Sequence, residues 1–155
     1  MTSIPLHDYT IYVGDSLPRL AEVLREKAYT QLIVLADANT AVHCLPHLEF
    51  LTPEFDYPVI TIPAGEHHKT LDTCRMIWQE LMQLQADRRA VLINLGGGVI
   101  GDMGGFCAST FKRGIDFIQV PTTLLAQVDA SVGGKLGIDF AEVKNSIGLF
   151  GNPQA

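Results

Sequence analysis

The sequence predicts an α/β protein with a parallel sheet and helices on both of its faces. Short apolar runs rich in β-branched residues alternate with stretches whose apolar residues recur at three- and four-residue spacing. One run, QLIVLA at 31–36, has no polar alternation, which is typical of a strand covered on both faces. Short links between the units imply right-handed crossovers between parallel strands.

The first part of the chain alternates strands and helices. A helix is expected to begin after Ser16, with Pro18 in its first turn, and to run to about Lys27. The stretch 37–50 is a poorer helix, because Pro46 interrupts it. These helices connect strands expected at 10–13 (TIYV), 31–36 and 58–62 (PVITI).

The second part continues the alternation as far as Pro121. The strongest helical periodicity lies at 70–85, and a helix ending near Thr110 follows a glycine-rich turn. Strands are expected at 90–95 (AVLINL) and 115–120 (IDFIQV). A helix at 122–130 should follow, and then a loop, because Gly133, Gly134 and Gly137 lie close together. The last residues, 151–155, look like the start of a linker at a domain boundary.

Composition excludes several classes of protein. The 155 residues suffice for about one domain, and 47% apolar with 18% charged residues excludes intrinsic disorder. A net charge of −6 argues against a general binder of nucleic acids or anionic membranes. No run approaches the roughly 20 apolar residues of a membrane span, and the N-terminus lacks signal-peptide features. The three cysteines form no Cys-x-x-Cys pair, which favours reduced thiols and a cytoplasmic location.

The glycine-rich turn is the first candidate site. GGGVIGD at 96–102 follows a buried strand and opens a helix, and Gly96, Gly98 and Gly101 satisfy G-x-G-x-x-G. Glycines let backbone N–H groups approach a pyrophosphate at a helix N-terminus. The alternative is a turn that is glycine-rich only for close helix–sheet packing. The acidic residue that closes the next strand in the usual fingerprint is missing, so a ribose contact must come from elsewhere.

Other strand ends supply candidates for that contact. Asp37 ends an earlier strand, and Glu66 and Lys69 follow the third strand. Strand C-terminal ends line the ligand crevice in such sheets. The competing interpretation of Glu66 and Lys69 is an exposed ion pair at a helix start, which would contribute little stability.

A polar, glycine-rich segment forms the third candidate site. Thr122 and Thr123 can offer hydroxyls at a helix start, and Asp129 lies six residues before Lys135 across a Gly-Gly turn. Cations near glycines suit a phosphorylated or carboxylated ligand, although each of these side chains alone is more often a solvated surface residue. The remaining polar candidates are Arg113, Lys144 and Asn145.

The histidines do not form a convincing metal site. His43 and His47 are four apart, as helix ligands would be, but Pro46 disrupts that geometry, and His67 and His68 are adjacent. No metal site is expected within this chain.

Five stretches of the sequence occur in the order seen in one enzyme family. They are PAGExxK at 63–69, GGGVIGD at 96–102, KRGI at 112–115, VPTTLLAQVDASVGGK at 120–135 and KNxIGxF at 144–150. The fourth stretch is long and highly specific. The chain therefore resembles the 3-dehydroquinate synthase family, whose members are more than twice as long, and 1–155 resembles their N-terminal NAD-binding α/β domain.

The resemblance implies a Rossmann-like domain that lacks the family's C-terminal helical domain, with the interdomain linker starting at about 150–155. The family enzyme converts 3-deoxy-D-arabino-heptulosonate 7-phosphate into 3-dehydroquinate and phosphate in the shikimate pathway. NAD is used catalytically and regenerated, and a divalent metal, zinc or cobalt, polarises the oxygens being oxidised. The metal ligands, one glutamate and two histidines, belong to the other half, so the isolated domain is expected to be inactive.

The resemblance also assigns roles to individual residues. Substrate-facing positions would be Asp129, Lys135, Lys144 and Asn145, with a phosphorylated sugar acid as substrate. Arg113 would reach a neighbouring subunit's site, which implies a homodimer. Contacts to NAD would come from Asp37, Glu66, Lys69, Gly97, Gly98, Val99, Asp102, Thr122, Thr123 and Leu125.

Two departures from the family pattern remain, and, besides a stand-alone nucleotide-binding or regulatory module without chemistry of its own, two enzymatic alternatives remain. Leu136 stands where the family has threonine, and Val143 where it has glycine, which puts the conformation of these loops in doubt. One alternative is another sugar phosphate cyclase with the same NAD chemistry. The other is a metal-dependent glycerol or alcohol dehydrogenase, against which the lysine-rich loops argue, because a neutral alcohol needs no such cations.

Overall fold

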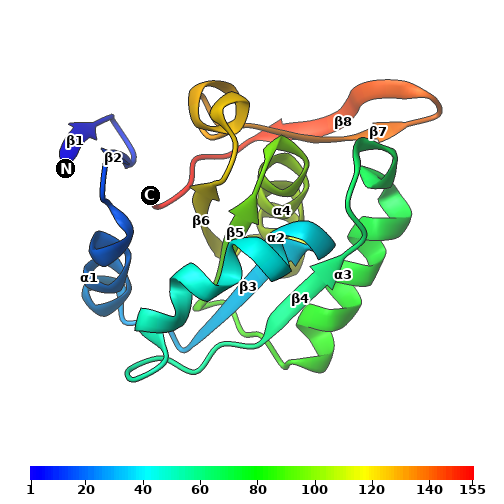
Figure 1. The fold of residues 1–155 in the computed structure, drawn as a ribbon. Coiled ribbons are helices and arrows are strands. Elements are labelled where there is room, and N and C mark those ends of the chain that lie inside the picture. The colour runs from blue at the N-terminus through cyan, green and yellow to red at the C-terminus, as the bar shows by residue number, and fades with distance from the viewer.

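A four-stranded parallel sheet forms the centre of the molecule (Figure 1). The computed structural model describes all residues from 1 to 155. The strand order is β4–β3–β5–β6, and all neighbours are parallel. The strands are β3 (Gln31–Asp37), β4 (Val59–Ile62), β5 (Ala90–Gly96) and β6 (Asp116–Pro121). The α/β class and these four strands are confirmed.

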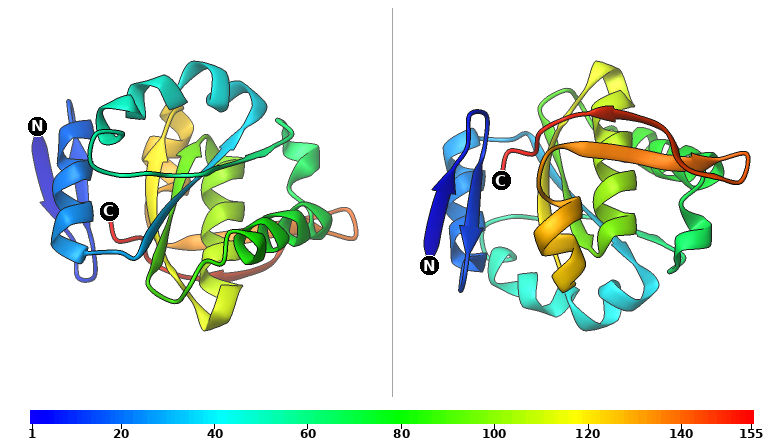
Figure 2. Two further views of the ribbon diagram at one scale, coloured as in Figure 1. Left: turned by 90° about the horizontal axis from the view of Figure 1, so that it is seen from below. Right: turned by 90° about the horizontal axis from the view of Figure 1, so that it is seen from above.

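Two layers of helices cover the sheet, because alternate side chains of each strand point to opposite faces. Ile33 and Leu35 of β3 belong to one apolar cluster with α3 and α4, whereas Leu32 and Val34 belong to a second cluster with α1 and η1. Figure 2 shows helices on both sides of the strands. The helices are α1 (Leu17–Lys27), α2 (Ala38–His43), η1 (Leu45–Leu51), α3 (Leu71–Gln83) and α4 (Gly98–Thr110). Pro46 divides the expected helix at 37–50 into α2 and η1, as predicted.

The first predicted strand is present but lies outside the parallel sheet. β2 (Thr10–Val13) pairs antiparallel with β1 (Thr2–Pro5), and this ribbon lies at one side of the molecule (Figure 1). The outer edge of β6 is met by the end of the chain instead. There Gln154 donates its N–H to Phe117 and Gln119 donates its N–H to Ala155, at 2.8 and 2.9 Å.

The loop expected after residue 130 forms only at 131–134, and a hairpin occupies the residues that follow. β7 (Lys135–Phe140) pairs antiparallel with β8 (Val143–Phe150), and Gly137 lies opposite Gly148. A Cβ at Gly148 would overlap the carbonyl oxygen of Leu136. Gly137 and Gly148 thus permit two strands to approach closely, whereas Gly133 and Gly134 lie in the short loop before the hairpin. The hairpin lies over α4 (Figure 1).

The helix expected at 122–130 forms only in part. Residues 124–125 are α-helical, and η4 (Ala126–Ala130) is a short π-helical turn. Leu124, Leu125 and Val128 of this segment are exposed.

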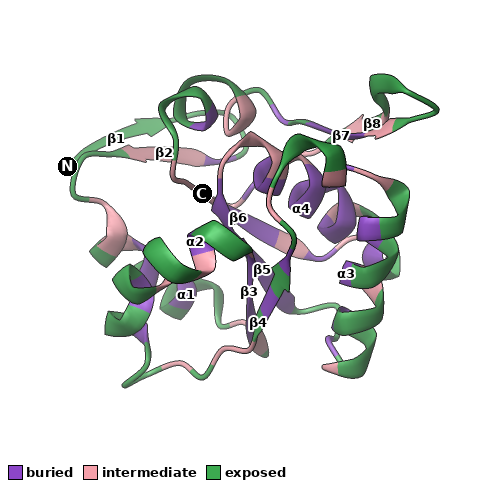
Figure 3. Ribbon diagram, turned by 45° about the vertical axis from the view of Figure 1, so that its right-hand side comes forward, coloured by how far each residue is buried: buried purple, intermediate pink, exposed green.

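Burial is greatest along the central strands and α4, as Figure 3 shows in purple, whereas the tip of the β7–β8 hairpin is exposed. All of β5 is buried, which fits the absence of polar alternation in its neighbour β3. None of the helices combines the length and apolar character that crossing a membrane would require.

Candidate functional site

The carboxyl ends of the parallel strands meet at one edge of the sheet, and predicted site residues follow every strand there. In open α/β sheets this edge is where ligands bind. The residues at this edge are Asp37 at the end of β3, Glu66 and Lys69 after β4, Gly97 and Gly98 after β5, and Thr122 and Thr123 after β6. The sequence therefore predicted correctly that these positions would gather.

Asp37 ends β3 and begins α2. One oxygen of its carboxylate, Oδ1, accepts the N–H groups of Asn39 and Thr40 at 2.8 and 2.9 Å. The Thr40 hydroxyl in turn accepts the N–H of Asp37 at 3.0 Å, which completes a capping box. The second oxygen, Oδ2, has no hydrogen-bond partner in the chain and can meet a ligand at the sheet edge.

The glycines of the 96–102 turn divide into two kinds. A Cβ at Gly96 would overlap the side chain of Ile100, and one at Gly101 would press on Gln119 at 3.3 Å, so both serve packing. At Gly97 and Gly98 a Cβ would meet its nearest neighbours only at 3.4 and 3.6 Å. Close packing therefore explains Gly96 and Gly101, whereas Gly97 and Gly98 fit the interpretation as a phosphate-binding turn.

The N-terminus of α4 is open to a ligand. Gly97 is its N-cap residue and offers no side-chain oxygen to the first turn. The first N–H groups of a helix have no acceptor within the helix, so Gly98, Val99 and Ile100 present donors beside Thr123. This arrangement, at the start of a 13-residue helix, suits a phosphate group.

Lys69 does not form the exposed ion pair with Glu66 that one interpretation expected. It is 3% exposed, and its Nζ lies 2.6 Å from Oδ2 of Asp102 and 2.6 Å from Oδ1 of Asn145. Glu66, in η2 (Glu66–His68), instead lies 3.7 Å from Nζ of Lys144. The two residues have different partners because the β7–β8 hairpin approaches from a distant part of the sequence.

A polar pocket of about 580 Å³ opens beside this ion pair. Its functional side chains come from α4, η4 and both strands of the hairpin, namely Asp102, Asp129, Lys135, Asn145 and Ser146. The first four were predicted as site residues and are brought together. Ser146 was not, although it adjoins Lys144 and Asn145 in the sequence and that position could have indicated it.

The acidity of Asp102 is set by opposing effects. Burial raises the pKa of its carboxyl above the ordinary value, the Lys69 ammonium lowers it, and the carboxylates of Glu66 and Asp129 raise it. Lys69 is thus the group that opposes the effects of burial and of the neighbouring carboxylates on the pKa of Asp102.

Three predicted residues belong neither to the lining of this pocket nor to the strand ends described above. Arg113, in η3 (Phe111–Arg113), lies at the opposite end of α4 from the glycine turn, roughly 20 Å along the helix axis. Leu125 is 72% exposed, on the outer surface beside η4. Lys144 is exposed on the hairpin and faces Glu66.

The side chains of the chain do not offer a metal centre. No three His, Cys, Asp or Glu side chains come together in the structure. The donor set therefore does not fit a divalent metal held by this chain alone.

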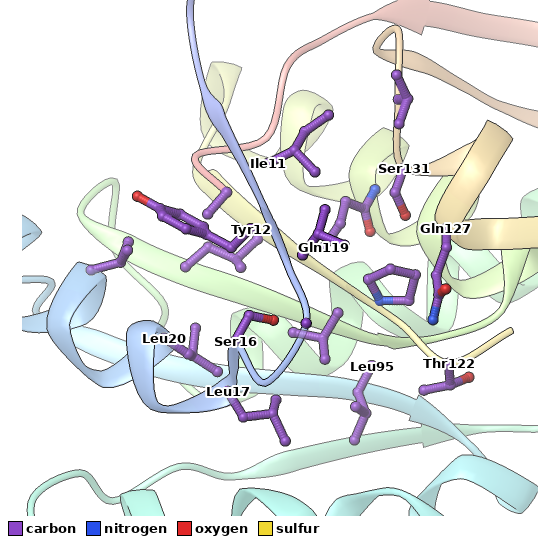
Figure 4. Close-up of a pocket in the computed structure, with 18 of the residues that line it drawn as sticks. Ile11, Tyr12, Ser16, Leu17, Leu20, Leu95, Gln119, Thr122, Gln127 and Ser131 are labelled. Atoms are coloured by element: carbon purple, nitrogen blue, oxygen red, sulfur yellow. The ribbon is translucent and has the colours of Figure 1, made fainter. Parts of the chain in front are cut away.

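A second, apolar pocket lies on the other face of the sheet, between the β1–β2 ribbon and β6 (Figure 4). Its volume is about 650 Å³. Tyr12, Leu17 and Leu95 contribute apolar walls, and Gln119 and Thr122 supply polar groups. No local sequence pattern indicated this pocket, because its walls come from six elements that are separate in the sequence.

The chain matches a family described as the N-terminal part of 3-dehydroquinate synthase, over residues 59–155. That match covers more than half of the chain. The chain belongs to this family. A 3-dehydroquinate synthase of Acetivibrio thermocellus is 43% identical over 151 residues, which are 94% of this chain but 41% of that protein. The chain therefore spans about two-fifths of the length of the curated relatives it matches.

Solved structures of related enzymes share the fold. A 2-deoxy-scyllo-inosose synthase, crystallised with carbaglucose-6-phosphate, NAD+ and Co2+, has a TM-score of 0.88 and 25% identity over 99% of this chain and 44% of its own. A 2-epi-5-epi-valiolone synthase from Streptomyces hygroscopicus, with NAD+ and Zn2+ bound, has a TM-score of 0.84 and 25% identity over 99% of this chain and 43% of its own. The Rossmann-like fold is thereby confirmed.

The two departures from the family pattern occupy different environments. Leu136 is buried, and its methyl groups fill the space beside Gly105, where a Cβ would overlap them. Val143 is 57% exposed near the tip of the hairpin. Leu136 thus contributes to the packing of the hairpin on α4 and also lines the polar pocket, where it places an apolar side chain at the position of the family's threonine. Val143 does not line that pocket.

Proposed function

We propose that this chain is the cofactor-binding part of a 3-dehydroquinate synthase. The enzyme would convert 3-deoxy-D-arabino-heptulosonate 7-phosphate into 3-dehydroquinate and phosphate, in the shikimate pathway. The single observation that supports this most strongly is the polar pocket, in which Asp102, Asp129, Lys135 and Asn145 converge near the open N-terminus of α4. Family membership and the unpaired cysteines support a biosynthetic enzyme located in the cytoplasm.

The residues at the sheet edge fit an NAD molecule. Unpaired N–H groups of Gly98 and Val99 would bind the diphosphate, and the free oxygen of Asp37 would accept a ribose hydroxyl. Such a cofactor supplies a reversible hydride acceptor when bound. The further proposed contacts are Glu66, Gly97, Asp102, Thr122, Thr123 and Leu125, whereas the buried Lys69 would act through Asp102 and Asn145.

The hairpin and η4 would bind the substrate. Lys135 and Lys144 carry positive charge for a phosphate or carboxylate, which the amide of Asn145 would help to orient. Asp129 would accept a hydrogen bond from a hydroxyl group. We also propose a homodimer, in which Arg113 serves the neighbouring subunit's site.

A related cyclase is the second candidate function. Two structures that resemble this chain over nearly its whole length are cyclases with other products, and one contains a phosphorylated carbasugar. Ring-closing specificity would depend on substrate contacts, so both functions share the same proposed cofactor site.

A turnover assay tests whether this chain alone can catalyse the proposed reaction. We expect the 155-residue chain to release no phosphate from the heptulosonate 7-phosphate when NAD and Zn²⁺ or Co²⁺ are supplied, because its side chains do not form a metal centre. Phosphate release well above a protein-free control would overturn the proposal that the metal and part of the substrate site lie elsewhere.

A further inference from the structure

Lys69 is the one charged residue among the buried side chains of the molecule. An ammonium group taken out of water destabilises a fold unless it is paired and hydrogen-bonded. Its two acceptors, the Asp102 carboxylate and the Asn145 amide oxygen, both lie at 2.6 Å. The burial of Lys69 therefore depends on these two partners, and their positions depend on Lys69.

The contacts of Lys69 join three separate parts of the chain. Its Nζ bridges α4, through Asp102, and β8, through Asn145, which are 33 and 76 positions away in the sequence. Its backbone carbonyl accepts the N–H of Asp139 in β7 at 2.9 Å. Both strands of the hairpin are thus attached to the residue that follows η2.

A hydrogen bond within the hairpin joins the two hairpin residues that Lys69 contacts. Oδ1 of Asp139 accepts the N–H of Asn145 at 2.8 Å. Asn145 has a φ of +50°, in the left-handed region, which a non-glycine residue keeps only when its surroundings hold it there. Lys69, Asp139 and Asn145 therefore form a closed set of contacts near the turn of the hairpin.

Lys69 is not part of the wall of the polar pocket, whereas Asp102 and Asn145 are. We propose that Lys69 is a positioning residue, which fastens the β7–β8 hairpin to α4 and holds Asp102 and Asn145 in their binding geometry. The inference deepens the cofactor site proposed above and rests on it for the identity of the ligand. Lys144 differs in kind, because it is exposed and lies 3.7 Å from Glu66.

The charges around Asp102 provide a signature of this role. Burial, Glu66 and Asp129 all raise the pKa of its carboxyl, Lys69 lowers it, and Lys135 lines the same pocket. Replacing Lys69 by an uncharged residue removes the lowering effect. The pKa of Asp102 then rises, so the carboxyl takes up a proton at a higher pH than in the wild type.

The test compares Lys69→Met with Lys27→Met, a matched change at an exposed lysine whose Nζ contacts Gln154. Hydrogen exchange without ligand should show the hairpin amides, including those of Asp139 and Asn145, exchanging at least about tenfold faster in Lys69→Met only. Carboxyl NMR titration should show a raised pKa for Asp102 in the same variant. Unchanged exchange and an unchanged pKa in Lys69→Met would overturn the proposal.

A second variant keeps the test decisive if Lys69→Met does not fold. Asn145→Gly can keep the positive φ at this position, preserves the Lys69–Asp102 pair and removes the side-chain contact with Lys69, so hairpin exchange should accelerate without a rise in the pKa of Asp102. Unchanged hairpin exchange in Asn145→Gly would equally overturn the role of Lys69 in holding the hairpin.

Titration with NAD separates this inference from the proposed function. We expect Lys69→Met to bind NAD about tenfold more weakly than wild type. A wild-type protein that does not bind NAD, with a loosened hairpin in Lys69→Met, would contradict the cofactor but uphold the fastening. Binding of NAD by the wild type, together with unchanged hairpin exchange and an unchanged pKa of Asp102 in Lys69→Met, would support the cofactor but contradict the positioning role of Lys69.

Discussion

Asn94, in the middle of β5, is buried with neither its amide nitrogen nor its amide oxygen hydrogen-bonded. Such a group destabilises a fold by about 1–3 kcal/mol. It fits because Gly104 of α4 faces it, and a Cβ at Gly104 would overlap the Asn94 side chain. The Asn94 side chain therefore requires a glycine at position 104, and a larger residue there would require a smaller one at position 94.

The double variant Asn94→Ala with Gly104→Ala tests this coupling. Gly104→Ala alone should destabilise the protein by about 1–3 kcal/mol through overpacking. In the double variant the new methyl group occupies space that the amide has left, although a methyl of Leu35 must also shift. We expect denaturant unfolding to show the double variant at least as stable as the wild type. Effects that simply add, within about 0.5 kcal/mol, would show that the pair is not coupled.

Asp37 connects the element scale to the site, because its carboxylate caps α2 while it ends β3 at the ligand edge. Substitutions at this position can distinguish the helix-capping role of Asp37 from its proposed contact with a ligand. Asparagine caps a helix about as well as aspartate, whereas alanine does not. The charge on Asp37 is therefore dispensable for α2 but not for a charge-assisted bond to a ribose hydroxyl.

Asp37→Asn and Asp37→Ala should behave differently. Thermal unfolding of Asp37→Asn should resemble that of the wild type, while Asp37→Ala loses about 1 kcal/mol of stability. Both variants should bind NAD at least about tenfold more weakly, by the loss of a charged hydrogen bond. Wild-type NAD affinity in Asp37→Asn would restrict Asp37 to its structural role.

At the scale of elements, sequence patterns predicted what local physics determines and missed what depends on distant contacts. Pro46 and the apolar run of β3 were sufficient to place η1 and a buried strand. Gly133, Gly134 and Gly137 indicated a loop, but the loop is confined to 131–134. Gly137 instead permits the close approach of β7 and β8, which only the strand pairing shows. Lys69 was predicted as a site residue, with an exposed ion pair to Glu66 as the alternative. Its burial against Asp102 and Asn145 was missed because these partners lie far along the sequence.

At the scale of the whole molecule, parallel topology assembles the site. Strand ends that are far apart in sequence reach one edge, so the residues following each strand could be grouped before the structure was known. The grouping of Asp129, Lys135 and Asn145 with Asp102 needs the hairpin to fold over α4. The apolar pocket beside β6 likewise arises only when the β1–β2 ribbon is in place.

Calorimetric titration of the protein with NAD+, in the wild type and in Gly98→Ala, tests the central claim most directly. A methyl group at Gly98 would meet only Ala130, at an ordinary 3.6 Å, so the fold should tolerate it. It would nevertheless crowd the N–H groups proposed to bind the diphosphate. We predict saturable binding to the wild type with a Kd below about 1 mM, and at least about tenfold weaker binding to an equally stable Gly98→Ala. Equal affinity in the two proteins, or no heat from the folded wild type, would contradict the account.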